Sequence, residues 1–230
     1  MNYLAKCSVV TFVIFCSQLA ASAQTTQFWP ELDTYVKLNP KMRLFFMASQ
    51  TREDQQFESA EIGANADFYF KPLVKLDRPR IFRLDPSKSR SLMLRVGYHY
   101  LSGPNSPSEQ RTIIELTPRY PLLSGFVVAD RNRADLRVVD GKFSWRYRNR
   151  LSVERTFMVG RIEFDPYVRV EAYYDSNYSK WSRTAIAGGC SFPIGKHFEI
   201  EPSYEHQNDT GKSPNSQING IGLTLSLYFP

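Results

Sequence analysis

The sequence predicts an all-β fold, namely a single antiparallel transmembrane β-barrel of about twelve strands, with about ten as the alternative. Three observations favour this fold class. Apolar and polar residues alternate with a period of two along most of the chain, many alternating runs are about 10 to 14 residues long, and tyrosines and tryptophans gather near the ends of the runs. A strand of a soluble protein typically has about 5 or 6 residues, whereas a tilted membrane strand needs about 9–11.

The first 23 residues have the pattern of a secretory signal peptide, which leaves residues 24–230 as an outer-membrane β-barrel domain. The apolar core of this segment has about 14 residues, short of the roughly 20 that a membrane-spanning helix needs. Ala21 and Ala23 occupy the small-x-small positions of a cleavage site. We therefore expect export and cleavage after Ala23.

Composition after cleavage excludes several classes of site. Removal of Lys6 lowers the formal net charge from +6 to +5, and Cys190 remains as the one thiol. A single cysteine forms neither an internal disulfide nor a cysteine metal cluster. The sequence also lacks a phosphate-binding glycine loop, a nucleophile elbow and metal-ligand spacing, so no cofactor is expected.

The segment KFSWRYRNRLSVER, residues 142–155, shows the period of two most clearly. Its odd positions carry mostly apolar residues and its even positions carry mostly charged ones, which predicts a strand with two unlike faces. A nucleic-acid-binding arm needs no sustained apolar face, so no nucleic acid is expected as a partner. Similar runs occupy residues 28–38, 41–51, 57–70, 91–100, 111–120, 125–138, 161–175, 183–192, 197–206 and 220–229.

Two architectures use such alternation. A soluble sheet or lipocalin-like barrel places its apolar residues inside, and a membrane barrel places them against lipid. Long runs favour the membrane barrel, as do aromatic residues such as Trp29, Tyr98 and Tyr228, which we assign to an interfacial girdle. The polar faces also carry residues that could neutralise one another across a lumen, among them Asp67, Arg111, Glu115, Glu199, Glu201 and Glu205.

Parity predicts an even number of strands. Eleven runs are plain, and bacterial single-chain barrels usually have an even number of strands, with both ends on the periplasmic side. Residues 73–84 are the candidate for the twelfth strand, although Pro79 is unfavourable within a strand.

The charged faces predict a charge network in the lumen. It either selects a small anionic solute, because rings of arginine favour anions, or forms a plug of mutual ion pairs that stabilises a narrow barrel. The plug is the favoured interpretation. The predicted members are Arg131, Arg133, Asp135, Arg137, Arg146, Arg148, Arg150, Glu154, Arg161, Glu163, Arg169 and Glu171.

No catalytic set is predicted. His99 and Ser102 invite comparison with a membrane-bound hydrolase of phospholipase type, but the alternation places His99 on the lumen face with Arg95 and Gly97. The expected role is therefore structural or pore-like. The hydrolase and a soluble periplasmic β-sheet protein that binds a ligand remain as alternatives.

Three sequence blocks resemble a family of exported Gram-negative proteins known as domain of unknown function 2490. They are FWPEL at Phe28–Leu32, DRNRADLR at Asp130–Arg137 and WRYRNRLSVER at Trp145–Arg155. The resemblance implies an outer-membrane β-barrel without an assigned activity. Membrane lipids and the outer-membrane insertion machinery are then the expected partners, although Pro230 follows the aromatic Phe229 that such machinery usually finds at the terminus.

Overall fold

The structure, a computed structural model, describes residues 25–70, 90–122, 125–160, 162–211 and 215–230. No helix among these residues has the length and apolar character needed to cross a membrane. The described residues form twelve strands: β1 (Thr25–Asn39), β2 (Met42–Glu53), β3 (Gln56–Tyr69), β4 (Leu92–Gly103), β5 (Ser106–Pro121), β6 (Phe126–Val139), β7 (Lys142–Arg155), β8 (Phe157–Val159), β9 (Ile162–Asp175), β10 (Lys180–Ile194), β11 (Phe198–Asp209) and β12 (Ser216–Phe229).

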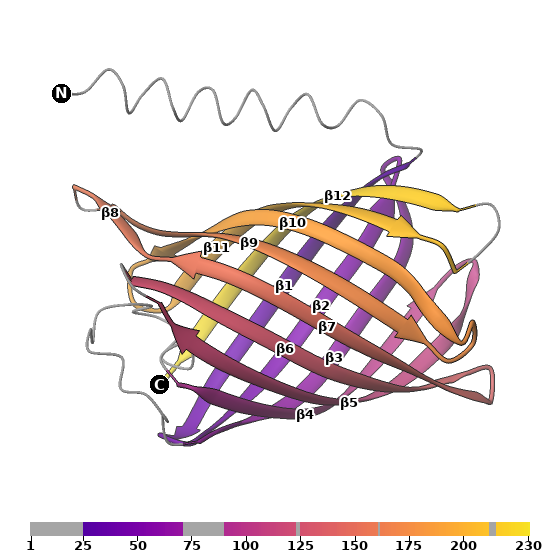
Figure 1. Cartoon of the computed structure of the whole chain (residues 1–230), viewed down its shortest axis with the longest axis horizontal. Helices are drawn as coiled ribbons and strands as arrows, with labels where there is room; N and C mark the ends of the chain where they lie inside the picture. Colours follow the sequence, from indigo (N-terminus) through magenta and orange to yellow (C-terminus); the bar gives the residue numbers. More distant parts are fainter. Residues whose placement is uncertain (1–24, 71–89, 123–124, 161, 212–214) are drawn as a thin grey trace.

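Eleven of these strands close into a barrel (Figure 1). Strands β1 to β7 and β9 to β12 pair in chain order, β7 pairs with β9, and β12 pairs with β1 to complete the ring. The β1–β12 pair is parallel, whereas the other neighbouring strands are antiparallel. The three-residue strand β8 pairs with β9 alone and stands outside the closed ring.

The predicted all-β barrel is confirmed, and twelve strands are present, but the twelfth is not the predicted one. The candidate strand at residues 73–84 lies outside the described residues. β3 pairs directly with β4, so the barrel closes without a strand between them. The parity argument was wrong, because the closed ring has eleven strands. An odd number of strands cannot all alternate in direction around a ring, so one neighbouring pair, β1 and β12, is parallel.

The barrel has two different ends. One, the Asp140 end, contains the tight β6–β7 turn, where Asp140 and Gly141 have φ of 49° and 73°, as an Asp-Gly hairpin turn requires. The other, the β8 end, contains β8 and the end of β12. Because β1 and β12 are parallel, β1 begins at the Asp140 end (Figure 1).

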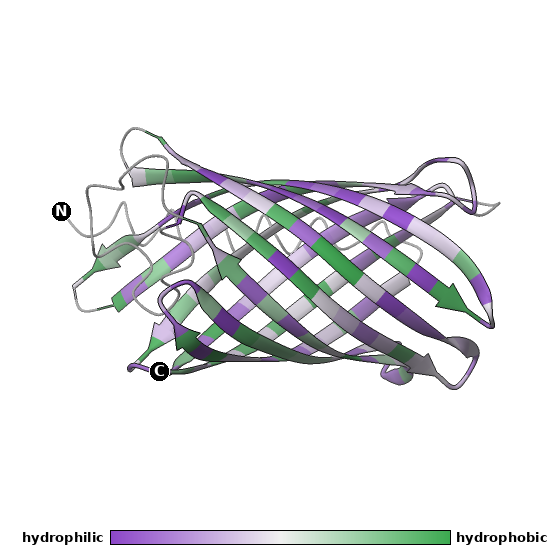
Figure 2. Cartoon of the chain, turned by 90° about the horizontal axis from the view of Figure 1, so that it is seen from below, coloured by the Kyte–Doolittle hydropathy of each residue, from purple (hydrophilic) through white to green (hydrophobic). Residues whose placement is uncertain are grey.

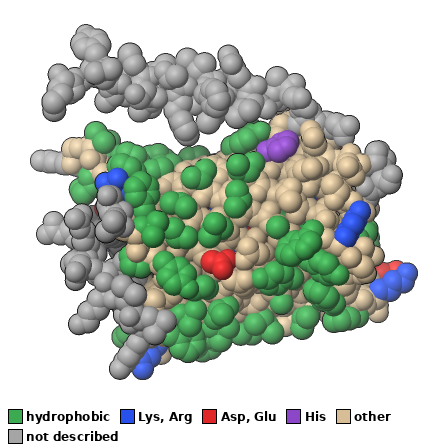
Figure 3. Space-filling view, viewed as in Figure 1, with side chains coloured by type: hydrophobic (Ala, Val, Ile, Leu, Met, Phe, Trp, Pro, Cys, Tyr) green, Lys and Arg blue, Asp and Glu red, His purple; other side chains and the backbone are tan. Residues whose placement is uncertain are grey.

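The two faces of the barrel wall have opposite polarity. Hydropathy alternates along the strands in Figure 2. The outer face in Figure 3 carries many hydrophobic side chains along its length, one acidic side chain near its middle, and lysine and arginine near the two ends. On β9, Val168 is 59% exposed on the outer face, whereas Glu171 is 4% exposed in the lumen. Apolar groups outside and charged groups inside are the arrangement of a membrane barrel.

Two of the aromatic residues assigned to the interfacial girdle lie in the lumen instead. Trp29 lines the central cavity, and a Cβ atom on Gly220 would lie 2.0 Å from its ring. Tyr228 stacks on Tyr35 with ring centroids 4.9 Å apart. Both residues share the phase of the lumen-facing residues on their strands. Tyr98, in contrast, is 49% exposed on the outer face.

Candidate functional site: the charged lumen

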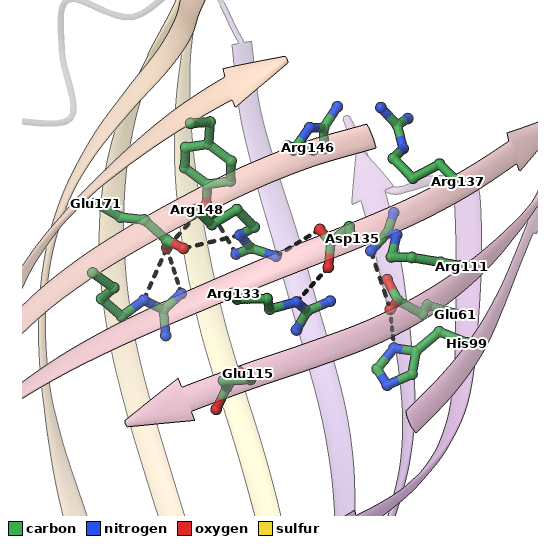
Figure 4. A network of polar contacts seen from close by, with 12 residues as sticks. Glu61, His99, Arg111, Glu115, Arg133, Asp135, Arg137, Arg146, Arg148 and Glu171 are labelled. Carbon is green, nitrogen blue, oxygen red and sulfur yellow. Dashed lines mark hydrogen bonds and ion pairs between the residues drawn. The ribbon is translucent and has the colours of Figure 1, made fainter. Parts of the chain in front are cut away.

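Glu171, near the middle of β9, is the centre of the largest ion-pair group (Figure 4). Its carboxylate accepts hydrogen bonds from Arg131 Nη2 at 2.7 Å, Arg148 Nε at 2.9 Å and Arg150 Nη2 at 2.6 Å. The Tyr173 hydroxyl donates a fourth at 3.0 Å. Three arginines thus share one carboxylate, and Arg131 Nε also lies 3.9 Å from Glu115 Oε2.

Asp135 forms a second group beside the first. Its Oδ1 accepts a hydrogen bond of 2.6 Å from Arg133 Nε, and Arg148 Nη1 lies 4.0 Å from its Oδ2. Arg148 therefore links the Glu171 and Asp135 groups, as the dashed lines in Figure 4 show. Because these charges are shielded from water, their attraction is stronger than that of a surface pair.

A chain of alternating charges runs along four neighbouring strands at the Asp140 end. Asp175 contacts Arg146 at 2.9 Å and Arg137 at 3.1 Å. Arg137 also donates to Glu109 at 2.6 Å, and Glu109 lies 2.8 Å from Arg111. Strands β9, β7, β6 and β5 are joined side chain to side chain in this way, along one side of the lumen.

His99 and Glu61 continue the network on the other side of Arg111. Glu61 contacts Arg111 Nη1 at 3.4 Å and the Nδ1 atom of His99, and His99 Nε2 lies 3.0 Å from Asn65 Oδ1. The predicted lumen position of His99 is thus confirmed. Ser102, three residues further along β4, belongs to the opposite face, so the two residues considered for a hydrolase do not meet.

Asp67 pairs with two arginines that the predicted network did not include. Arg43 Nε lies 2.8 Å and Arg95 Nε 2.6 Å from its carboxylate. Both guanidinium groups also stack on aromatic rings, Arg43 at 4.1 Å from the Tyr35 centroid and Arg95 at 4.2 Å from the Phe45 centroid. Cation–π contacts of this kind hold the charges in place.

The wall formed by β1 and β11 is acidic. Asp33 accepts a hydrogen bond from the Tyr35 hydroxyl at 3.0 Å, and Glu201 accepts from the Tyr167 hydroxyl at 2.6 Å. Glu31 lies beside them in the lining of the central cavity. None of the ion pairs within the described residues involves Glu31, Asp33 or Glu201.

Two adjoining cavities occupy the lumen. The central one has a volume of about 390 Å³ and lies between the acidic wall and the arginines of β4 to β9. The smaller one has a volume of about 220 Å³ and extends toward the β8 end, where Met93, Thr117 and Ser152 line it. The two cavities share Tyr35, Arg95, Arg131, Arg150, Arg169 and Glu201.

Nine of the twelve residues predicted for the network are members of ion pairs. Eight belong to the groups described above, and Arg169 pairs with Glu205 at 3.1 Å. Glu154 lines the smaller cavity. Glu163 is half-buried, and its Oε1 has no hydrogen-bond partner among the described residues. Arg161 lies outside the described residues.

The prediction missed several partners because it concentrated on β6, β7 and β9, where charges are densest. The missed carboxylates of Glu61, Glu109 and Asp175 lie on other strands or at a strand end, whereas Asp67 was predicted on the lumen face without its arginine partners. Their alternation places each of them on the lumen face, so the period of two was the signal that could have found them. The described residues contain no group of three or more histidine, cysteine or acidic side chains placed to hold a metal ion.

A closed sheet with an apolar outer surface and an ionised interior defines the class of membrane-type β-barrels. Residues 26–218 match the family model described as "Protein of unknown function (DUF2490)". The chain therefore belongs to this family, as its resemblance in three blocks suggested.

No match was found among curated proteins. Among solved structures, the chain is similar to the beta domain of the Bordetella autotransporter Brka. The TM-score is 0.45 at 12% sequence identity, over 81% of this chain and 83% of that chain.

Proposed function

We propose that the protein is an outer-membrane β-barrel of a Gram-negative bacterium with a pore-like role: a narrow, charge-lined passage for small polar solutes. Export by the signal peptide of residues 1–23, cleavage after Ala23 and assembly by the outer-membrane insertion machinery belong to this proposal. Membrane lipids would surround the outer face. The polarity of the two faces supports the membrane location. Many large apolar side chains, such as Val168, are exposed on the outer face, and a lipid bilayer would cover them with hydrocarbon.

The single observation that carries the pore-like role is the pair of adjoining cavities, of about 390 and 220 Å³, inside the ring. A barrel that is only a plug would fill its interior with side chains. Here space continues from the middle of the lumen toward the β8 end, and the ion-pair chain from Asp175 to Arg111 borders the Asp140 end. We expect the passage to be small and its width at the Asp140 end to depend on that chain.

Conductance across a planar lipid bilayer tests this role. We expect purified wild-type protein to give small, discrete conductance steps. Arg137→Ala removes the link between Glu109 and Asp175 and should increase the step size. Leu136→Ala is the matched control, because the neighbouring residue is 39% exposed on the outer face and its loss should leave the steps unchanged.

A structural plug is the second candidate, and the density of ion pairs around Glu171 favours it. It makes a different forecast in the same experiment, namely no steps from the wild type and none from Arg137→Ala. That result would remove the pore-like role and leave a barrel whose interior serves stability.

Location is tested separately by extraction and electrophoresis. An outer-membrane barrel should stay in the membrane pellet after carbonate treatment and should migrate differently on SDS gels with and without heating. Release by carbonate without detergent would contradict the membrane location and would favour the soluble periplasmic ligand-binding protein.

A further inference from the structure

The lumen carries opposite charges on opposite walls. In the ring of eleven strands, β6 lies five strands from β1 in one direction and β7 lies five strands from β1 in the other. The arginines at positions 131 and 150 therefore project from the side of the barrel that faces Glu31 and Asp33. A transverse separation of charge of this kind produces a strong field across the space between the walls.

Each wall keeps an excess of one charge. On the arginine side, four guanidinium groups face three carboxylates: Arg131, Arg133, Arg148 and Arg150 pair with Glu115, Asp135 and Glu171. On the acidic side, no ion pair within the described part of the chain involves Glu31, Asp33 or Glu201. The excess charge is therefore positive on one wall and negative on the other.

The central cavity lies between these walls and is lined by both. Its volume of about 390 Å³ falls within the range of about 300–1,000 Å³ typical of small-molecule sites. Hydroxyl groups of Ser203, Thr224 and Ser226 also line it and offer further hydrogen bonds. A ligand there meets guanidinium groups at one side and carboxylates at the other.

We propose that the central cavity binds a small zwitterion, specifically an unblocked dipeptide. Its carboxylate would lie against Arg131 and Arg150, and its ammonium group against Glu31 and Asp33. The proposal deepens the proposed function, since it names the class of solute, and it rests on that function for access to the lumen from outside.

The charge arrangement selects against simpler ligands. A pure anion would be repelled by the acidic wall, and a pure cation would be repelled by the arginines. A free amino acid carries both charges on one carbon atom, whereas two residues of extended chain span about 7 Å. A dipeptide therefore separates its two charges, as the two walls separate theirs.

Isothermal titration calorimetry on the full mature chain, refolded in detergent micelles, tests the proposal with three probes. They are alanyl-alanine, its N-acetylated form without an ammonium group, and its amide without a carboxylate. We expect saturable binding of alanyl-alanine and at least about tenfold weaker binding of both blocked forms, because each loses one charged contact. Equal binding of the free and acetylated peptides would overturn the proposal in favour of a simple anion site.

Variants of the acidic wall sharpen the test. Glu31→Gln combined with Asp33→Asn should remove the preference for alanyl-alanine over its acetylated form, since the ammonium partners are gone. Asp130→Asn is the matched control, because Asp130 accepts its hydrogen bond from Asn149 on the outer face and its neutralisation should leave the preference intact. If the double variant loses heat-modifiable migration, the single Glu31→Gln replaces it and should reduce the preference. An unchanged preference in a folded variant would overturn the proposal.

Failure of this inference is distinguishable from failure of the pore-like role. Conductance steps without binding of any probe would overturn the dipeptide site and leave the pore. Binding of alanyl-alanine without conductance steps would support the site and overturn the pore.

Discussion

Val168 and Arg169 are consecutive residues of β9, yet they occupy opposite environments. Val168 is exposed on the outer face, whereas Arg169 points into the lumen, pairs with Glu205 and lines both cavities. A soluble barrel would reverse the two positions, because water would then be outside and the apolar core inside. The difference teaches that the effect of a substitution depends on the face it falls on as much as on the residue type.

The largest effect is expected on the lumen side, at Glu171→Ala. Removal of this carboxylate leaves Arg131, Arg148 and Arg150 without their shared partner, and an unpaired buried charge costs about 3–5 kcal/mol. Denaturant titration of the protein refolded in micelles measures the loss. Glu171→Gln keeps the shape and some hydrogen bonds, so its loss should be smaller. A change below about 1 kcal/mol for the alanine variant, a surface-pair value, would mean that water already screens these charges.

On the outer face, Val168→Arg should destabilise the barrel by roughly 2–4 kcal/mol, the cost of an arginine at the middle of the bilayer. Val168 lies at the midpoint of β9, so its side chain has little chance to reach the interface. Refolding into lipid vesicles and denaturant titration give the value, with Val168→Leu as the control near zero. Equal tolerance of arginine and leucine there would contradict the assigned outer face.

A change of packing in the lumen should have an intermediate effect. Gly220→Ala places a methyl group 2.0 Å from the Trp29 ring, which must move, and overpacking of this kind costs about 1–3 kcal/mol. The variant should also shift the Trp29 fluorescence. Combining it with Trp29→Leu should recover part of the lost stability, and strict additivity of the two changes would show that the residues do not interact.

The smallest effect is expected at Arg169→Val, directly beside the most sensitive outer position. Glu205 loses its ion pair but keeps the hydrogen bond of 2.8 Å from Gln207, and the site borders both cavities. We expect a loss of about 1 kcal/mol or less, as for a pair that water partly screens. Insertion into vesicles should be unchanged. A loss as large as that of Val168→Arg would contradict the contrast between the two faces.

The sequence predicted the faces well because side-chain direction alternates along a strand by covalent geometry alone. The alternation of positions along β9 is enough to predict that Val168 lies outside and Arg169 inside. The ion-pair partners do not follow from the alternation. Glu171 on β9 contacts Arg131 on β6 only because the order of strands around the ring places β7 alone between them. The same limit explains why nine predicted residues were found in ion pairs, while Asp175 was left out and Asp67 was placed in the lumen without its arginine partners.

Strand closure was the second feature that the sequence did not predict. Period and length say nothing about whether the first strand meets the last in parallel or antiparallel orientation. Trp29 was misassigned for a related reason: aromatic residues suit both an interface and a lumen, and only the phase of β1 against its neighbours distinguishes them.

The parallel seam between β1 and β12 joins residues nearly two hundred positions apart, such as Phe28 and Ile221. Until β12 is in place, both β1 and β11 present open rows of backbone amides and carbonyls, which hydrocarbon does not tolerate. Insertion and closure must therefore be coupled, and a chain that lacks β12 would remain an open sheet with two unpaired edges. Any protein that assisted assembly by holding these edges would consequently have to release the chain as β1 and β12 pair.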